Sequence, residues 1–222
     1  MGHKRVTLFA GHYGSGKTNL AVNWALNLKD EGYKVAVADL DIVNPYFRSK
    51  DDEAELTEAG VKLICSQYAN TNVDVPALPQ ELYSIVDDKT THVVIDVGGD
   101  DRGALALGRI SPALVEENDY EMIFVINKFR PLTQDAKSTF EVMREIEVAS
   151  GIKCTAIINN SNLGRETDEE DVLGSIEYAK ECEKLCGIPL KATAVEESLF
   201  EKLQDKVENL MPIHIRRKYK WN

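Results

Sequence analysis

The sequence predicts an α/β fold in which helices cover both faces of a mostly parallel central sheet. Apolar, β-rich runs alternate with segments of helical periodicity almost to the end of the chain. The runs Val93–Asp96 and Met122–Ile126 are apolar at nearly every position, as is typical of strands buried between two helical layers. Right-handed crossovers then bring the carboxyl ends of the strands to one edge of the sheet, where binding sites gather.

Each expected element follows from a local pattern. Short β-branched or aromatic runs bounded by turn residues predict strands at Val6–Ala10, Lys34–Asp39, Val61–Ile64, Val93–Val97, Met122–Asn127, Thr155–Asn159 and Leu190–Thr193. Longer segments with apolar residues three and four apart predict helices at Lys17–Lys29, Pro79–Asp87, Ala104–Glu117, Thr133–Ser150, Glu169–Cys186 and Glu196–Gln204. The irregular stretch Ser66–Pro79, with two prolines, is expected to be a surface loop within the domain.

The composition is that of a globular, soluble chain. At 222 residues and 43% hydrophobic content we expect one domain over residues 1–213, followed by a basic tail at 214–222. The net charge of −11 disfavours general binding to nucleic acid, because such a body repels phosphate backbones. No secretory signal or membrane-length apolar run is visible, so we expect a cytoplasmic protein.

The four cysteines fit that compartment. Cys65, Cys154, Cys182 and Cys186 are few, and only the last two are close in sequence. Cys182 and Cys186 share a helix face, but a metal site needs more ligands than their neighbourhood offers. We expect structural or incidental thiols, with a metal or cluster site as the alternative.

The most specific motif follows the first strand. Residues Gly11 to Thr18, GHYGSGKT, match the phosphate-loop pattern G-x-x-x-x-G-K-[ST], with a strand before it and a helix after it. Glycines let backbone N–H groups converge on phosphate oxygens, Lys17 faces the β- and γ-phosphates, and Thr18 offers its hydroxyl to Mg²⁺. The nucleotide-binding residues expected here are Gly11, His12, Tyr13, Gly14, Ser15, Gly16, Lys17, Thr18 and Asn19.

Acidic residues for the metal end two other strands. Asp96 follows three apolar residues, which is the Walker B arrangement that holds Mg²⁺, and Gly99 can offer its N–H to a terminal phosphate. Asp39 and Asp41 stand at alternate positions after the second strand. We expect Asp39 in the metal shell and Asp41 to orient the attacking water, so that Lys17 and Asp41 are the catalytic residues.

This order of parts resembles the MinD/ParA class of P-loop ATPases, which includes the nitrogenase iron protein. The resemblance extends over roughly residues 6–200 and implies the P-loop NTPase fold, ATP and Mg²⁺ as cofactors, a client protein and a nucleotide-dependent homodimer. In that class the loop reads K-G-G-x-G-K-T, and its first lysine reaches the nucleotide of the partner. Here His12 and Tyr13 stand at this point, so another cation such as Arg48 or Arg102 would have to take that role.

The base is expected to be adenine. Asn127 and Lys128 start a guanine-type N-K-x-D motif, but Arg130 replaces the aspartate that accepts from guanine, and an arginine has no acceptor. In the resembled class an asparagine after the sixth strand reads adenine, which indicates Asn159 or Asn160; either can instead cap a turn. We take Asn159 as the candidate.

The chain ends in a basic, aromatic segment. Arg216, Arg217, Lys218 and Lys220 alternate with Tyr219 and Trp221, with no acid among them. A solvated tail folded on the acidic body is expected, and contact with an anionic membrane is the alternative. His3, His92 and His214 are scattered and predict no catalytic group.

Three functions fit this pattern. The leading hypothesis is a slow Mg-ATPase that binds ATP and ADP and switches a client protein in assembly, activation or cofactor insertion. The second is a small-molecule kinase or ATP-dependent ligase, with an acceptor pocket at Ser66–Pro79 or Asp100–Gly108. The third is a non-hydrolysing nucleotide-binding module.

Overall fold

The computed structural model describes residues 2–40, 50–65, 80–99 and 101–215. Eight strands form one sheet in the order β3-β2-β4-β1-β5-β6-β7-β8, and every neighbouring pair is parallel. The strands are β1 (Val6–Ala10), β2 (Val35–Asp39), β3 (Lys62–Cys65), β4 (His92–Asp96), β5 (Tyr120–Ile126), β6 (Ala156–Asn159), β7 (Leu190–Glu196) and β8 (Leu210–Ile213). The prediction of a mostly parallel sheet is confirmed.

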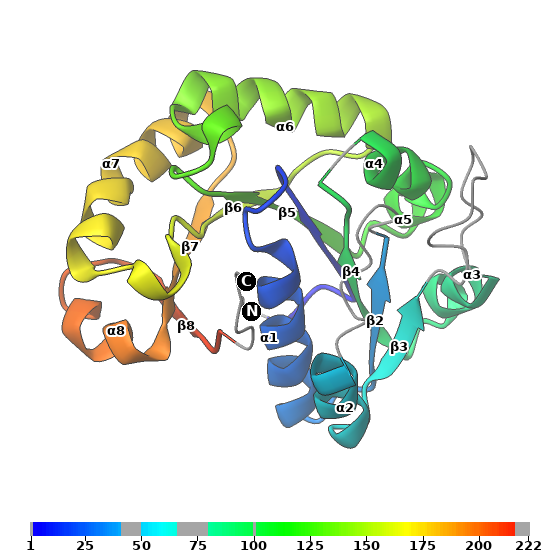
Figure 1. Cartoon of the computed structure of the whole chain (residues 1–222). Helices are drawn as coiled ribbons and strands as arrows, with labels where there is room; N and C mark the ends of the chain where they lie inside the picture. Colours follow the sequence, from blue (N-terminus) through cyan, green and yellow to red (C-terminus); the bar gives the residue numbers. More distant parts are fainter. Residues whose placement is uncertain (1, 41–49, 66–79, 100, 216–222) are drawn as a thin grey trace.

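The helices connect successive strands, as the crossovers of a parallel sheet require. They are α1 (Lys17–Asp30), α2 (Lys50–Glu58), α3 (Gln80–Asp87), α4 (Asp101–Leu107), α5 (Ser111–Glu117), α6 (Ala136–Ser150), α7 (Glu169–Cys186) and α8 (Glu197–Leu203), with short 3₁₀ turns η2 (Pro131–Thr133) and η3 (Gly164–Glu166). Figure 1 shows α1 running directly from the loop after β1 across the middle of the sheet.

Two apolar layers hold the helices on the sheet. Val6, Leu8 and Ala10 of β1 point into the layer shared with α3, α4, α5, α6 and α7, whereas Phe9 points into the layer shared with α1 and α2. This alternation is the period of two expected of a strand buried on both sides. Helices on both faces of the sheet, as predicted, leave only the strand ends open for a site.

The elements differ from the prediction in four places. The helix expected over Ala104–Glu117 is two helices, α4 and α5, because Pro112 lacks the N–H that a continuous helix needs and lies in the first turn of α5. The helix expected from Thr133 begins at Ala136, since the Asp135 side chain accepts from Ser138 N and caps it. Helix α2 and strand β8 were not predicted.

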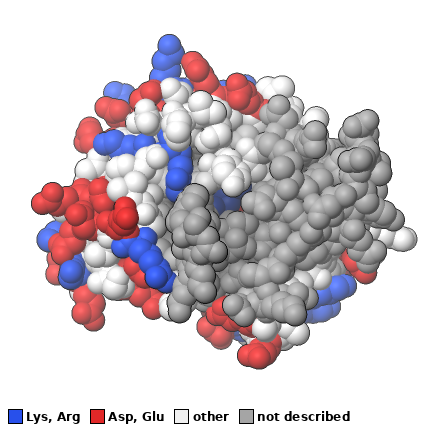
Figure 2. Space-filling model, viewed as in Figure 1, with Lys and Arg blue, Asp and Glu red and all other residues white. Residues whose placement is uncertain are grey.

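Among the described residues, no helix combines the length and apolar character needed to cross a bilayer. Charge is unevenly distributed on the surface. Figure 2 shows acidic side chains gathered on the left, over the beginning of α7, whose first turn holds Glu169, Glu170 and Asp171. These carboxylates lie at a helix N-terminus, where the helix dipole stabilises negative charge.

Candidate functional site

Carbonyl groups of the loop between β1 and α1 accept hydrogen bonds from within the loop, from α1 and from the segments that follow β5 and β6. His12 O accepts from Ser15 N at 3.1 Å and from Lys17 Nζ at 3.2 Å. Gly14 O accepts from Arg130 Nε at 2.8 Å, and Ser15 O accepts from Asn160 Nδ2 at 2.7 Å. These hydrogen bonds restrain the loop, and restraint of a binding loop lowers the entropic cost of binding.

Glycine is required where this loop is tightest. A Cβ on Gly16 would lie 2.1 Å from Asn160 Nδ2, and φ is +92° there. A Cβ on Gly11 would lie 2.4 Å from Val125 O. Both approaches come from strands that follow β1 in the sheet order, so the loop is packed against the ends of β5 and β6.

Helix α1 begins without a side-chain cap. Gly16 is its N-cap residue, no side chain accepts from the first turn, and the first turn contains no acidic residue. The N–H groups of a first helical turn have no partner within the helix, and the helix dipole places partial positive charge there. This end of α1 is therefore built to face an anion.

One carboxylate contacts Thr18, and a second lies next to it in the sheet. Asp39 and Asp96 end the neighbouring strands β2 and β4 at the same register, and both are buried. Thr18 Oγ1 donates a 2.5 Å hydrogen bond to Asp96 Oδ2, and Leu40 N donates to Asp96 O at 2.9 Å. Asp96 thus contacts the first turn of α1, and Asp39 is its direct neighbour in the sheet.

These groups form an oxygen donor set. A threonine hydroxyl and two carboxylates are hard ligands, and Mg²⁺ prefers such ligands, completing its shell with water and phosphate oxygens. Among the described residues, no group of three or more His, Cys, Asp or Glu side chains is arranged to hold a metal without such help. The residues therefore fit Mg²⁺ bound together with a nucleotide, and do not fit a dedicated metal centre.

The loop after β4 touches the phosphate loop. A Cβ on Gly99 would lie 2.8 Å from Tyr13 N and Cα and 3.0 Å from Lys17 Nζ. Only a residue without a side chain allows this approach. A displacement of Gly99 would therefore require Lys17 and Tyr13 to move as well.

The two unusual residues of the loop have different surroundings. Burial, the charge of Lys17 and then that of Arg130 lower the pKa of His12. His12 is half-buried, so loss of solvation disfavours the charged imidazole, and the two nearby cations add to this effect. Tyr13, by contrast, is 64% exposed and leaves the loop toward solvent.

The two candidate asparagines lie in different hydrogen-bond environments. Asn159 is fully buried; its Nδ2 donates to Ser175 Oγ at 2.9 Å, and its Oδ1 accepts from Ser161 N and Oγ. Asn160 is 2% exposed and donates to the phosphate loop, while its Oδ1 has no hydrogen-bond partner among the described residues. Of the two, Asn160 is the one that contacts the loop.

The turn after β5 contributes a residue whose place the sequence did not reveal. Asn127 Nδ2 donates to Asn162 O, and Asn127 Oδ1 accepts from Phe129 N. Lys128 Nζ donates to Gly174 O, so the hydrogen bonds of these two side chains go to partners outside the phosphate loop. Arg130 contacts the loop, through Gly14 O. From the sequence alone, this arginine is interpreted only as a missing aspartate, because no strand order is predicted that would place the end of β5 beside the loop.

Several predicted residues cannot be located in this way. Asp41, Arg48 and the stretch Ser66–Pro79 lie outside the described residues, as does the tail from 216 onward. Arg102 belongs to α4, but its side chain is not described. Asn19 lies in the first turn of α1, where its carbonyl accepts from Asn23 Nδ2.

The cysteines whose side chains are described lie in α7 and just before β6. Cys154, Cys182 and Cys186 are free thiols. Burial raises the pKa of Cys182 to about 12 and that of Cys186 to about 11. Both thiols are therefore protonated at neutral pH, and thiols in this state are poor metal ligands and poor nucleophiles.

The sheet order, the loop at the end of β1 and the uncapped start of α1 together define a P-loop NTPase domain. The sequence matches, over residues 6–184, the family CbiA, described as the CobQ/CobB/MinD/ParA nucleotide binding domain. This chain belongs to that family, and the predicted resemblance to the MinD/ParA class is confirmed. No match was found among curated proteins.

Solved structures share the fold. FtsY from the chloroplast of Physcomitrella patens is 20% identical with a TM-score of 0.57, covering 89% of this chain and 60% of its own. FtsY from Thermotoga maritima is 21% identical with a TM-score of 0.55, covering 86% and 62%. The 54 kDa signal recognition particle protein from Aeropyrum pernix, in complex with GDP, is 20% identical with a TM-score of 0.52, covering 85% and 40%. The chain thus spans about three-fifths or less of these proteins, and the likeness concerns the fold.

Proposed function

We propose that this chain binds Mg-ATP, hydrolyses it slowly and acts as a nucleotide-dependent switch on a client protein. The observation that carries the proposal is the hydrogen bond from Thr18 to Asp96, which joins the phosphate loop to a buried carboxylate at the end of β4. Loop, hydroxyl and carboxylate are the parts that a P-loop protein needs to hold a triphosphate with its metal.

Each residue has a role in this proposal. The N–H groups from Gly11 to Thr18 surround the β-phosphate, and Lys17 neutralises charge on the β- and γ-phosphates. Thr18, Asp96 and Asp39 hold Mg²⁺, which supplies charge neutralisation of the transferring phosphoryl group when it is bound. Asp41 orients the attacking water, a role that remains a sequence-based proposal.

ATP is the proposed nucleotide. Arg130 stands where guanine recognition needs an acceptor, and its N–H groups are donors only. Asn160, with a buried Oδ1 next to the loop, is a suitable acceptor for the amino group of adenine; Asn159 remains the alternative. The GDP-bound structure of similar fold belongs to a protein that is only 20% identical, so GTP must be compared directly.

The switch is proposed to act through Gly99. Because this residue approaches Tyr13 and Lys17 so closely, a γ-phosphate beside Lys17 reorganises the loop that leads into α4. Hydrolysis removes that phosphate and relaxes the loop. A client protein, or a second copy of the chain in a homodimer, would distinguish the two states.

A second candidate is a small-molecule kinase or ATP-dependent ligase. The presence of His12 favours this candidate, since the loop then lacks the lysine that reaches across a dimer in the resembled class. Such an enzyme would remain monomeric with nucleotide and would turn over rapidly only with an acceptor.

Calorimetric titration with ATP and GTP tests the binding step. Lys17→Ala should weaken ATP binding by at least about a hundredfold, because it removes the cation that the phosphate loop itself directs at the β- and γ-phosphates. Lys29→Ala, in the last turn of the same helix, is the matched control and should bind normally. Unchanged affinity in Lys17→Ala would refute the proposed site.

Light scattering and phosphate release then separate the candidates. A dimer that forms only with Mg-ATP supports the switch, whereas a monomer with bound ATP favours the kinase or ligase. Asp41→Asn should retain ATP binding but slow phosphate release, and an effect on affinity alone would assign Asp41 to the metal. No hydrolysis in the unmodified chain would indicate a passive binding module.

A further inference from the structure

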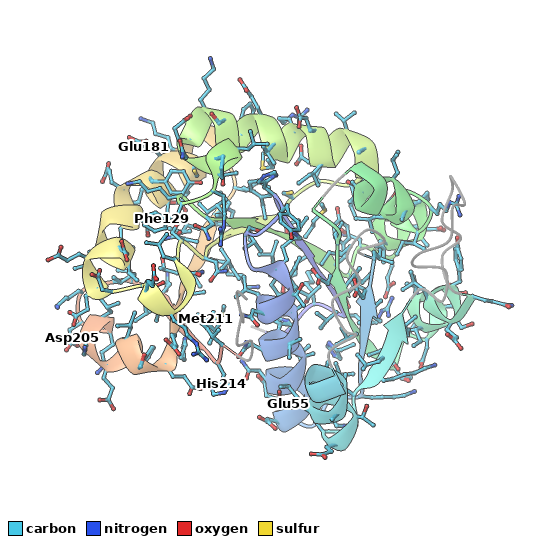
Figure 3. The ribbon with its side chains drawn as sticks, in the orientation of Figure 1. Glu55, Phe129, Glu181, Asp205, Met211 and His214 are labelled. Atoms are coloured by element: carbon cyan, nitrogen blue, oxygen red, sulfur yellow. The ribbon has the colours of Figure 1, made fainter. Side chains whose placement is uncertain are left out.

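Arg130 is held in a fixed turn at the carboxyl end of β5. Its N–H donates to Asn127 O at 3.1 Å, and its carbonyl accepts from Thr133 N at 3.0 Å. Thr133 Oγ1 also donates to Asn127 O in this turn, at 2.7 Å. The backbone of Arg130 is therefore fixed relative to β5, which is the direct neighbour of β1 (Figure 3, where the adjacent Phe129 is labelled).

The guanidinium lies against the phosphate loop itself. Nε donates to Gly14 O at 2.8 Å, and a Cβ on Gly14 would lie 3.2 Å from Nε and 3.5 Å from Cδ and Cζ. The hydrogen bond and the short distances to the Cβ position of Gly14 describe the same close approach. The Arg130 side chain thus contacts the loop at Gly14, in the middle of the phosphate-loop motif.

The charge of Arg130 reaches the interior of the loop. Together with burial and Lys17, it lowers the pKa of His12. The neighbouring Lys128 is directed elsewhere, since its Nζ donates to Gly174 O at 2.8 Å. The turn therefore presents one of its two cations to the loop.

We infer that Arg130 is a second cation of the nucleotide site, supplied by the same chain, and that its guanidinium binds the polyphosphate of the nucleotide. The inference rests on the proposed function. One of its five N–H donors is used on Gly14 O, and the planar group carries four more that suit phosphate oxygens. Bonds of this charge-assisted kind are the strong ones.

Two substitutions distinguish charge from loop support. In Arg130→Gln the amide nitrogen stands at the position of Nε and can still donate to Gly14 O, but the charged fork is gone. Arg130→Met has similar length and removes both the donor and the charge. Lys128→Gln is the matched control, because it removes a neighbouring positive charge that does not contact the loop.

Binding of ATP, adenosine and inorganic triphosphate, each with Mg²⁺, is measured for every variant by calorimetric competition. Arg130→Gln and Arg130→Met should both weaken ATP and inorganic triphosphate by about ten- to hundredfold, with adenosine affected little. Arg130→Lys should recover part of the loss, and Lys128→Gln should remain within about twofold of the unmodified chain. Thermal unfolding without ligand verifies that each variant is folded.

Three results would overturn the inference. Normal binding in Arg130→Gln with loss in Arg130→Met would limit Arg130 to supporting Gly14. Loss of ATP binding with normal triphosphate binding would assign it to the nucleoside. Normal binding in both variants would remove it from the site. The proposed function fails separately, if the unmodified chain binds no nucleotide or if Lys17→Ala binds as well as the unmodified chain; the inference about Arg130 then fails with it.

Discussion

Thr18 Oγ1 donates a hydrogen bond to Asp96 Oδ2, although the two residues are 78 positions apart in the chain. The bond joins the first turn of α1 to the end of β4, two elements that reach the same point because β4 and β1 are neighbours in the sheet. Because the Thr18 hydroxyl and the Asp96 carboxylate already lie side by side, both could bind the same cation with little rearrangement. This geometry is the reason for placing the metal here.

Asp96→Asn is expected to weaken the effect of Mg²⁺ on ATP binding while leaving the fold intact. The asparagine oxygen can still accept from Thr18, so the contact to the loop survives, but the negative charge is lost. We expect the gain in ATP affinity from Mg²⁺ to fall by about ten- to hundredfold. Titration with Mg²⁺ and with a chelator measures it.

Asp119→Asn provides the control for this substitution. Asp119 is an exposed carboxylate that pairs with Lys4 at 3.5 Å, near the opposite end of the sheet. Its loss should not change the Mg²⁺ dependence. An unchanged Mg²⁺ dependence in Asp96→Asn would exclude Asp96 from the metal site.

The close packing of Gly16 on Asn160 predicts a difference between two glycines. Gly16 and Gly32 have nearly the same φ, +92° and +90°, but a Cβ on Gly32 meets nothing within 4 Å. Gly32→Ala should cost about 1–2 kcal/mol of unfolding free energy for the left-handed backbone. Gly16→Ala should cost about 1–3 kcal/mol more, because its Cβ would displace the Asn160 amide.

Urea denaturation of the two variants measures this difference. Adding Asn160→Ala to Gly16→Ala should restore part of the lost free energy of unfolding, because the clashing amide is then absent. The coupling energy of the double-mutant cycle measures how much is restored. Equal destabilisation of Gly16→Ala and Gly32→Ala would mean that Asn160 does not approach the loop as described.

The sequence predicts those parts of the site that are encoded by neighbours in the chain. Gly11 to Thr18 form one continuous motif between a strand and a helix, and Asp39 and Asp96 each end a clear apolar strand. By contrast, the contacts of Arg130 with Gly14 and of Asn160 with Ser15 join residues 116 and 145 positions apart. They depend on which strands become neighbours, and no local pattern states that.

The same reasoning explains the missed elements. Strand β8 is short and contains Pro212, which an edge strand tolerates because one side of its backbone needs no partner. Helix α2 reads KDDEAELTE, and with few apolar residues it shows no clear helical periodicity. Strand β8 is an edge strand, and α2 leads into the other edge strand, β3. Elements at a sheet edge bury less apolar surface, so their sequences show weaker apolar periodicity.

The lowered pKa of His12 predicts a response to both pH and ligand. Folding favours the neutral imidazole, so the unfolded chain binds more protons at and below pH about 6.5. The free energy of unfolding therefore does not depend on this histidine above that pH, and it decreases as the pH falls below it. Bound polyphosphate places negative charge near the ring and should raise its pKa, which NMR titration of the imidazole would follow.

Arg130→Gln should also raise the pKa of His12 in the absence of ligand, since one of the two cations that lower it is removed. His12→Gln should abolish the proton uptake that this ring contributes on ATP binding, measured by calorimetry in buffers of different ionisation enthalpy. His214→Gln, beyond β8, serves as the control. No change in the pKa of His12 on nucleotide binding would mean that the phosphates do not lie beside it.

Asn159 and Asn160 are adjacent in sequence but should respond oppositely to substitution. Asn159→Ala removes hydrogen bonds to Ser175 and Ser161 inside the protein, and each is worth about 1 kcal/mol. We therefore expect a loss of about 2 kcal/mol in the free energy of unfolding, with ATP affinity nearly unchanged. Asn160→Ala should instead lower ATP affinity by about tenfold, because it frees Ser15 O and removes the proposed acceptor for adenine.

Inosine triphosphate separates these two effects of Asn160, since it lacks the amino group of adenine. If Asn160 Oδ1 accepts from that group, the unmodified chain prefers ATP to inosine triphosphate and Asn160→Ala loses the preference. If Asn160 only supports the loop, both nucleotides weaken equally and the ratio persists. If Asn159→Ala abolishes the preference while the protein stays folded, the base is recognised by Asn159, whose amide must then leave Ser175 and Ser161 when ATP binds.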